Sequence, residues 1–156
     1  MPIPAASHAT EPAPSATTCV WDLLPDEQEP GRLRSWVSAI LHRLGLARFA
    51  DDLTLIADEL AANALRHGGT PAHVTLSVTR AEGGSRVRLE VTDAGAGFDA
   101  ARVVRSWDDA EAMLEGCSGR GLLIVAGLSR RWGTFRRAAG HTVWAELAVV
   151  TPAPAI

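Results

Sequence analysis

The sequence predicts an α+β fold in which helices lie on one face of a largely antiparallel sheet. Apolar residues in the first half of the chain recur at helical spacing, which indicates two amphipathic helices. Strands with alternating apolar and polar residues follow them, joined by glycine-containing turns typical of hairpins. Helices packed on one face of such a sheet form a two-layer sandwich.

Both expected helices have a clear apolar stripe and a glycine that ends them. The first ends at Gly45, and its stripe consists of Leu33, Val37, Ile40, Leu41 and Leu44. The second runs from Asp51 to Gly69, and its stripe consists of Phe49, Leu53, Ile56, Leu60 and Ala64. Acidic residues at the start of the second helix suit the positive end of its dipole.

The remaining pattern indicates strands, a lid and one further helix. Residues 99–115 are mostly polar and are expected to form a lid or loop with one helix in it, and Gly121–Leu128 is expected to be a short apolar helix after a glycine turn. The expected strands are 17–24, 74–79, 87–93, 132–137 and 142–149, the first of them at the sheet edge.

The length of 156 residues predicts a single domain, expected over residues 17–150. Residues 1–16 are rich in Pro, Ala, Ser and Thr and are expected to be a disordered N-terminal tail, and residues 151–156 a short C-terminal tail. The net charge of −3 offers no electrostatic case for nucleic acid, and no apolar run approaches membrane-spanning length. We therefore expect neither nucleic acid nor membrane as a partner.

Two compositional features narrow the class of protein further. The chain has no lysine, because all fifteen basic residues are arginine, and this excludes a Walker A phosphate loop. Cys19 and Cys117 lie far apart without a ligand-like spacing, and no secretory signal pattern precedes the domain. We therefore expect reduced thiols and a cytoplasmic location.

The second helix presents two polar side chains that are suited to binding. Glu59 and Asn63 are four residues apart, so they stack on one helical face. A carboxylate and a carboxamide in this arrangement can hold a metal ion and the nucleophile beside it. For this helix taken alone, the favoured interpretation is a pair of solvated side chains on the surface.

Asp93 continues the apolar phase of the strand that begins at Val87, so it points to the apolar face. A carboxylate in that position is costly unless it accepts hydrogen bonds. A base with an exocyclic amino group would supply the donor, and the turn from Ala94 to Gly97 leaves room for it. The alternative, equally supported by strand and turn, is a carboxylate that caps its own turn through backbone N–H groups.

Gly119, Arg120 and Gly121 precede the last apolar helix. Glycines before a helix N-terminus expose backbone N–H groups that can cradle phosphates without a lysine. Arg120 can add charge to a phosphate. The alternative is an ordinary glycine turn with a solvated arginine, and it is strong for a single motif of this kind.

Taken in order, these motifs resemble the GHKL ATPase family, which has the Bergerat fold. The resemblance covers residues 17–149 and rests on ELAAN at 59–63 with RHG at 66–68, DAGAGF at 93–98, GRGL at 119–122 and GHTVW at 140–144. It implies a two-layer sandwich with helices on one face of a mixed, mainly antiparallel sheet. Glu59 and the short segment between the glycine motifs resemble the anti-sigma factor serine/threonine kinase branch.

The resemblance implies a role for each matching residue. Asn63 would coordinate Mg²⁺ that bridges the phosphates, and Glu59 would be the general base towards the accepting hydroxyl. Asp93 would bind the adenine amino group, and Thr142 would help through water or its hydroxyl. Gly95 and Gly97 would let the turn close on the base, and Gly119 and Gly121 would let the lid fold over the phosphates. Arg120 would add charge next to a phosphate. His67 is expected only to cap the helix end.

The implied function is that of a regulator which binds Mg-ATP, phosphorylates a Ser or Thr of a small antagonist protein, and sequesters a sigma factor. A first alternative is a non-catalytic module that uses ATP to shape a surface for a protein partner. A second is a free-standing ATPase domain of histidine-kinase type, although residues 1–50 are too short and proline-rich for a dimerisation hairpin with a phospho-acceptor histidine. A homodimer is a possible assembly, because the family often forms one.

Overall fold

The computed structural model describes residues 15–109, 117–138 and 140–149 of the chain. The described strands form one five-stranded sheet in the order β1-β2-β3-β5-β4. Every neighbouring pair in this order is antiparallel. The strands are β1 (Ser15–Leu23), β2 (Ala72–Ala81), β3 (Gly84–Asp93), β4 (Arg131–Arg137) and β5 (Gly140–Val149).

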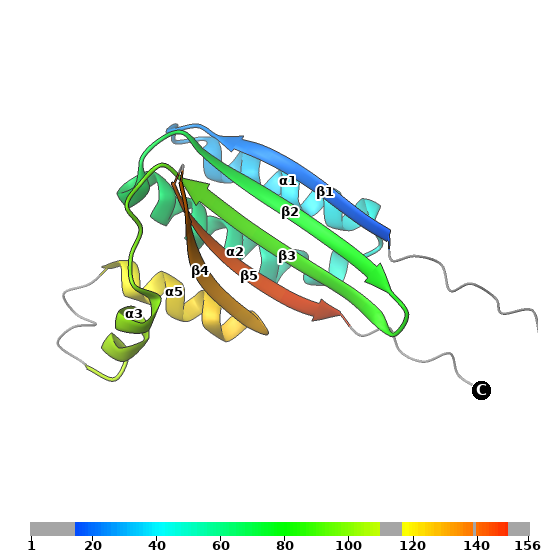
Figure 1. Ribbon diagram of the computed structural model, residues 1–156. Coiled ribbons are helices and arrows are strands. Elements are labelled where there is room, and N and C mark those ends of the chain that lie inside the picture. Colours follow the sequence, from blue (N-terminus) through cyan, green and yellow to red (C-terminus); the bar gives the residue numbers. More distant parts are fainter. Residues whose placement is uncertain (1–14, 110–116, 139, 150–156) are drawn as a thin grey trace, which may run out of the picture.

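The helices form the second layer of the molecule. Figure 1 shows α1 and α2 together on one face of the sheet, and α3 and α5 together at one end of the molecule. This arrangement confirms the predicted α+β sandwich. The helical elements are α1 (Glu29–Arg43), η1 (Ala47–Phe49), α2 (Ala50–Asn63), η2 (Ala64–Gly68), α3 (Ala100–Ser106) and α5 (Cys117–Leu128).

The core lies between the sheet and the two long helices. Every second residue of β3 is buried from Val87 to Asp93, as the alternating pattern predicts. The buried face of β3 meets the apolar stripe of α2, where Leu53, Ile56 and Leu60 are almost fully buried. Burying each of these side chains stabilises the fold by about 1.5–3 kcal/mol, so a one-residue slip of β3 would be costly. The core therefore fixes the position of Asp93.

The predicted helix from Asp51 to Gly69 is interrupted near its end. α2 finishes at Asn63, and a π-helical turn, η2, follows it. The amide of Gly69 donates to the carbonyl oxygen of Ala64 at 3.0 Å, a bond that spans five residues instead of four. Such widened turns are frequent at functional sites. Here the turn brings Gly68 against Asp93 at the end of β3.

Other boundaries also differ from the prediction. α5 begins at Cys117, so Gly119 and Gly121 lie inside the helix rather than in a turn before it. β1 begins at Ser15, because its pairing with β2 continues to the Ser15–Arg80 register beyond the apolar pattern. Most of the expected N-terminal tail, the C-terminal tail and part of the expected lid lie outside the described residues. None of the described helices is long and apolar enough to cross a membrane.

Candidate functional site

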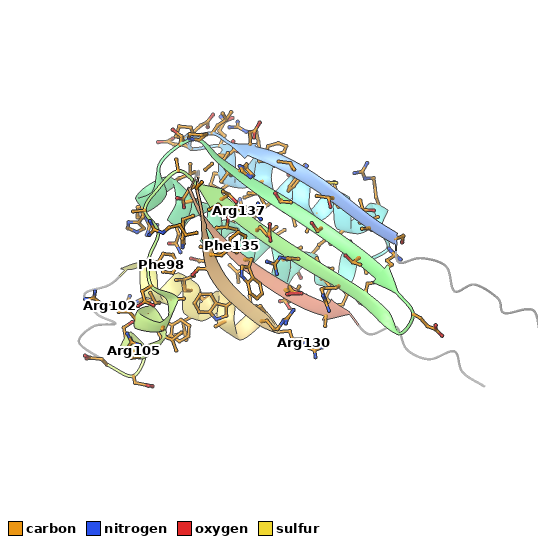
Figure 2. All side chains as sticks on the ribbon, in the orientation of Figure 1. Phe98, Arg102, Arg105, Arg130, Phe135 and Arg137 are labelled. Atoms are coloured by element: carbon orange, nitrogen blue, oxygen red, sulfur yellow. The ribbon has the colours of Figure 1, made fainter. Side chains whose placement is uncertain are left out.

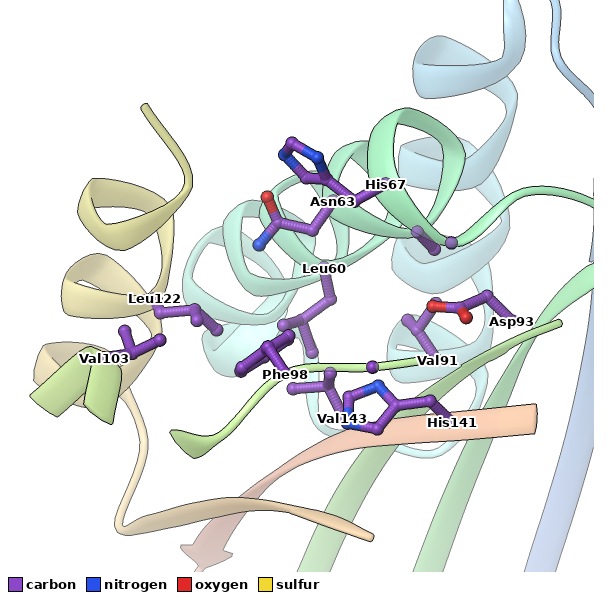
Figure 3. Close-up of a pocket in the computed structure, with 13 residues that line it drawn as sticks. Leu60, Asn63, His67, Val91, Asp93, Phe98, Val103, Leu122, His141 and Val143 are labelled. Atoms are coloured by element: carbon purple, nitrogen blue, oxygen red, sulfur yellow. The ribbon is translucent and has the colours of Figure 1, made fainter. Parts of the chain in front are cut away.

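A cavity of about 270 Å³ lies between the helical layer and one end of the sheet. Its apolar lining comes from α2, β3, β5, α3, α5 and the loop after β3, namely Leu60, Val91, Phe98, Val103, Leu122 and Val143. Its polar side chains are Asn63, His67, Asp93 and His141 (Figure 3). Mostly apolar walls with a few convergent polar groups are typical of a site for a small organic ligand.

Asp93 lies at the end of β3, where only 8% of it is exposed. Its Oδ1 accepts a hydrogen bond from the backbone N–H of Gly95 at 2.7 Å. Within the described residues, no donor is bonded to Oδ2. The carboxylate therefore caps its own turn and also keeps an acceptor oxygen for a ligand, so the two interpretations of Asp93 are compatible.

Asn63 lies on the helical wall of the cavity, across from Asp93 (Figure 3). The cavity thus brings together two motifs that are distant in the sequence. Glu59, one turn earlier on α2, is half-buried but is not among the residues that line the cavity. Its carboxylate lies against Gly121 of α5, so closely that a Cβ at that glycine would overlap Oε2.

Gly97 is needed in the loop that follows β3. Its φ angle is +76°, a left-handed conformation that other residues seldom adopt. A Cβ at this position would also overlap the imidazole ring of His141. Gly97 lines the cavity, whereas Gly95 contributes its backbone N–H to Asp93 and packs against Gly68.

The third motif contributes to the site from within α5. Gly121 is buried against Glu59, and the neighbouring Leu122 lines the cavity. Arg120 is exposed. Gly119 lies in the first turn of the helix. Figure 2 shows Phe98, Arg102 and Arg105 at this end of the molecule, and both of these arginines are exposed on α3.

Thr142 faces away from the cavity. In β5 its side chain lies on the sheet face opposite the helices, where its hydroxyl is 2.8 Å from the hydroxyl of Thr92. The expected contribution of a Thr142 hydroxyl to base binding therefore has no support in the position of the side chain. The alternation of the strand instead directs the preceding residue, His141, into the cavity.

His141 is 3% exposed, and its Nε2 is a buried polar atom without a hydrogen-bond partner among the described residues. Its ring lies 5.1 Å from that of Phe98 between centroids. Burial lowers the pKa of His141, the nearby Asp93 partly opposes this, and Arg136 lowers the pKa further. At neutral pH the imidazole is therefore uncharged, with one N–H donor and one acceptor.

Sequence reasoning missed His67, Phe98 and His141 as lining residues. His141 shares its strand phase with Val143, Ala145 and Leu147, all of which are buried. The argument that placed Asp93 on the apolar face would therefore have placed His141 there too. No equivalent signal exists for His67 or Phe98, because the π-helical turn and the glycine loop determine their positions.

The two-layer fold is that of a GHKL-type domain, and comparison with known proteins identifies the family. The model of the histidine kinase-like ATPase domain matches residues 24–147. The chain therefore belongs to the histidine kinase-like ATPase domain family, for which ATP binding is expected.

Among solved structures, the chain is similar to full-length ShkA in complex with AMPPNP. The two are 29% identical with a TM-score of 0.47, over 68% of this chain and 23% of the ShkA chain. No curated protein sequence matches this chain.

Proposed function

We propose that the protein binds Mg-ATP in this cavity and transfers the γ-phosphoryl group to a Ser or Thr of a small antagonist protein. The main support is that Asn63 and Asp93 line one cavity from opposite walls. One wall offers a carboxylate oxygen for an amino group, and the other offers an amide for the phosphate end. A nucleotide that lies across the cavity would therefore meet both side chains.

Asp93 and the apolar walls would hold the base. The free Oδ2 of Asp93 accepts a hydrogen bond from the adenine amino group, while Oδ1 stays bonded to Gly95. Val91, Val143 and Phe98 cover the faces and edges of the ring and exclude water. A carboxylate that is already fixed by its own turn loses little freedom on binding, which favours affinity.

Asn63 is suited to bind a magnesium ion whose other ligands are mainly substrate phosphates and water. The described residues contain no group of three or more His, Cys, Asp or Glu side chains arranged around a metal. Mg²⁺ commonly binds through one or two protein oxygens together with water and substrate phosphates. The side-chain oxygen of Asn63 can be such a ligand, and the ion would neutralise phosphate charge.

Glu59 is proposed as the general base because it lies one helical turn from Asn63. The Ser or Thr hydroxyl of the partner would lose its proton to the Glu59 carboxylate as its oxygen forms a bond to the γ-phosphorus. The bond between the γ-phosphorus and the bridging oxygen breaks, and ADP leaves. Transfer requires Glu59 to turn from Gly121 towards the cavity.

By resemblance to the anti-sigma branch, the partners would be a sigma factor, a small antagonist protein, or both. This proposal implies a cytoplasmic regulator of transcription, with a homodimer as its candidate assembly. The position of Glu59 outside the cavity lining favours a second candidate function, an ATP-binding module that sequesters a partner without phosphorylating it.

One assay separates the two candidates. The protein is incubated with γ-labelled ATP, Mg²⁺ and the small candidate antagonist proteins of the host. We expect label on one antagonist and a fall of about 100-fold or more for Glu59→Ala, the scale typical of losing a general base. Glu82→Ala is the control, because Glu82 is exposed in the β2–β3 turn.

Transfer by Glu59→Ala at the wild-type rate would show that Glu59 is not the base. Bound ATP without any labelled antagonist would instead support the non-catalytic module. Absence of ATP binding would refute both candidates.

A further inference from the structure

We infer that an arginine cluster on the sheet face opposite the helices is a docking surface for an acidic segment of a partner protein. The cluster consists of Arg86, Arg88, Arg130 and Arg131, and Glu146 lies at its centre. The cavity proposed for ATP lies between the sheet and the helices, on the other side of the sheet. The docking surface is therefore separate from that cavity, and this inference does not depend on ATP binding.

The strand register places the cluster on the outer face of the sheet. Glu146 is opposite Arg88 in the β3–β5 pair and opposite Arg131 in the β4–β5 pair, so these side chains share one face. Glu146 also has the strand phase of Thr142, whose side chain lies away from the helices. Figure 1 shows the helices on the opposite side, and β4 is the last strand of the described sheet at this edge. Neither the described helices nor a further described strand covers the cluster.

Glu146 holds three of the guanidinium groups in place. Its side chain is 4% exposed, and its carboxylate lies 2.7 Å from Arg131, 3.2 Å from Arg88 and 3.2 Å from Arg86. A buried carboxylate is costly unless it is paired, so this one requires the arginines around it. The Arg88 guanidinium also stacks on the ring of Trp144, at 4.2 Å from its centroid. The cluster is therefore organised before any partner arrives.

Positive charge exceeds negative charge in the cluster. Its four arginines meet two carboxylates, those of Glu146 and Glu90, so two positive charges remain unbalanced. The side chains of Arg86 and Arg131 are 65% and 58% exposed, although each contacts Glu146. Arg130 makes no side-chain hydrogen bond or ion pair within the part of the chain that the structure describes. Because a guanidinium group has five N–H donors, most of the donors in this cluster are available to a ligand.

The available donors surround a hollow of about 170 Å³, which is lined by Arg86, Arg130, Arg131, Glu146 and Ala148. A carboxylate is the anion that these arginines already bind, since Glu146 contacts three of the four. A second carboxylate in the hollow would accept from the outward-facing donors and reduce the excess of positive charge. The chemistry of the hollow thus matches the side chain of a glutamate or an aspartate.

The surroundings favour a protein segment over other anions. Trp144 lies beside the hollow with its ring over Gly133, where a Cβ would overlap it, and offers an aromatic surface to residues that flank the acidic side chain. Tryptophan and arginine are the residue types most enriched at the energetic centres of protein interfaces. The whole chain has a net charge of −3, so a long polyanion would also meet repulsive surface. A short acidic segment can contact the cluster alone.

The test uses a synthetic peptide of alternating Glu and Thr as the acidic segment. Amide and indole N–H signals in NMR spectra of the full chain are followed while the peptide is added. We expect shifts for residues around the hollow and for the indole N–H of Trp144, and weaker binding as salt is raised. The same peptide with Gln in place of Glu should cause no such shifts.

Two pairs of substitutions locate the binding. Arg86→Gln together with Arg130→Gln should raise the dissociation constant of the peptide about 3- to 10-fold, the scale of two exposed ion pairs. Arg88 and Arg131 remain to pair with Glu146 in this variant. The matched control is Arg102→Gln together with Arg105→Gln, which removes the same charge from exposed positions of α3 and should leave the dissociation constant unchanged.

Four results would each overturn the inference. The first is no shift with the acidic peptide, or an equal loss of affinity in both double variants. The second is saturation of the same signals by inorganic phosphate at the same concentration, which would indicate a simple anion site. The third is tighter binding of a single-stranded oligonucleotide at the hollow. The fourth is a dimer of the chain that the Arg86→Gln and Arg130→Gln changes abolish, which would make a second copy the occupant.

A single substitution keeps the test decisive if the double variant does not fold. Arg130→Gln removes a side chain without an ion pair among the described residues, so the fold should tolerate it. We expect a rise of about 2-fold in the dissociation constant of the peptide, the scale of one exposed ion pair. An unchanged constant would count against the inference. ATP affinity is measured separately, and its presence or absence decides only the proposed function.

Discussion

At the scale of single residues, the protonation of His141 is coupled to folding. Burial lowers the pKa of this histidine in the folded protein below its ordinary value of 6.5. As pH falls below 6.5, the unfolded chain binds a proton more readily than the folded chain does. We expect the free energy of unfolding to fall over this range and to be insensitive to His141 above it. Urea unfolding at pH 7.5 and pH 5.5 measures the effect.

Two variants are compared with the wild-type protein in this unfolding experiment. His141→Phe should lose this part of the pH dependence, whereas His42→Phe should keep it, because His42 is exposed on α1. The difference between the wild type and His141→Phe isolates the contribution of His141 to the pH dependence. If His141→Phe kept the wild-type pH dependence of the free energy of unfolding, that dependence would not arise from the buried imidazole of His141.

Single residues also show how far a sequence pattern determines a site. The alternation of β3 was sufficient to predict Asp93 on the buried face. The same rule applied to β5 places His141 on the cavity face and the Thr142 hydroxyl on the opposite face, so this part of the geometry was predictable from the residues. The role of Gly121 was not predictable from the sequence, because its contact with Glu59 joins two helices that no local pattern relates.

At the scale of elements, the approach of α5 to α2 depends on Gly121. A Cβ there would overlap Oε2 of Glu59, the flexible end of a side chain, so the carboxylate would move rather than the helices. Because transfer requires the Glu59 carboxylate to leave Gly121, we expect Gly121→Ala to raise the rate of phosphoryl transfer while ATP affinity changes little. Its stability should change by less than the roughly 0.5–1 kcal/mol that an alanine ordinarily gains over glycine in a helix. Transfer assays and chemical unfolding measure the two effects.

Gly127→Ala is the matched control in the same helix. A Cβ at Gly127 meets nothing within 4 Å, so this variant should gain the full helix propensity and keep the wild-type transfer rate. Equal transfer by both variants would show that the contact between Glu59 and Gly121 has no bearing on the reaction.

The boundaries of elements were less predictable than their existence. Helical spacing identified α1 and α2, but the π-helical turn after Asn63 was missed because its first residue, Ala64, continues the same apolar stripe. The start of α5 was placed too late, since Gly119 and Gly121 favour a turn in isolation. Tertiary packing against α2 overrides that preference.

At the scale of the whole molecule, local patterns predicted antiparallel hairpins but not the order of the strands. The two hairpins, β2–β3 and β4–β5, join through β3 and β5, which leaves β4 at the sheet edge. This junction positions Asp93 beside His141 and forms the sheet wall of the cavity. A pairing between segments so distant in the sequence has no local signature, so the complete cavity could not be derived from the motifs alone.

Because the cavity joins both layers, ATP binding should stabilise the entire domain. A ligand that binds only the folded state raises the free energy of unfolding by about 2.7 kcal/mol when its concentration is 100 times its dissociation constant. For a chain of this length that corresponds to a rise in Tm of about 5–10 °C. We expect this shift for wild-type protein with Mg-ATP and a much smaller one for Asp93→Asn at the same ATP concentration, measured by differential scanning calorimetry.

Asp93→Asn is a suitable variant because asparagine keeps an oxygen for the Gly95 N–H at 2.7 Å and replaces the other acceptor with an amino group. The amino group would face the adenine amino group, so base binding loses its acceptor while the turn remains capped. Asp22→Asn provides the control, since Asp22 is exposed on β1. An equal ATP-induced shift in wild type and Asp93→Asn would place the base elsewhere, and the proposed nucleotide site would then fail.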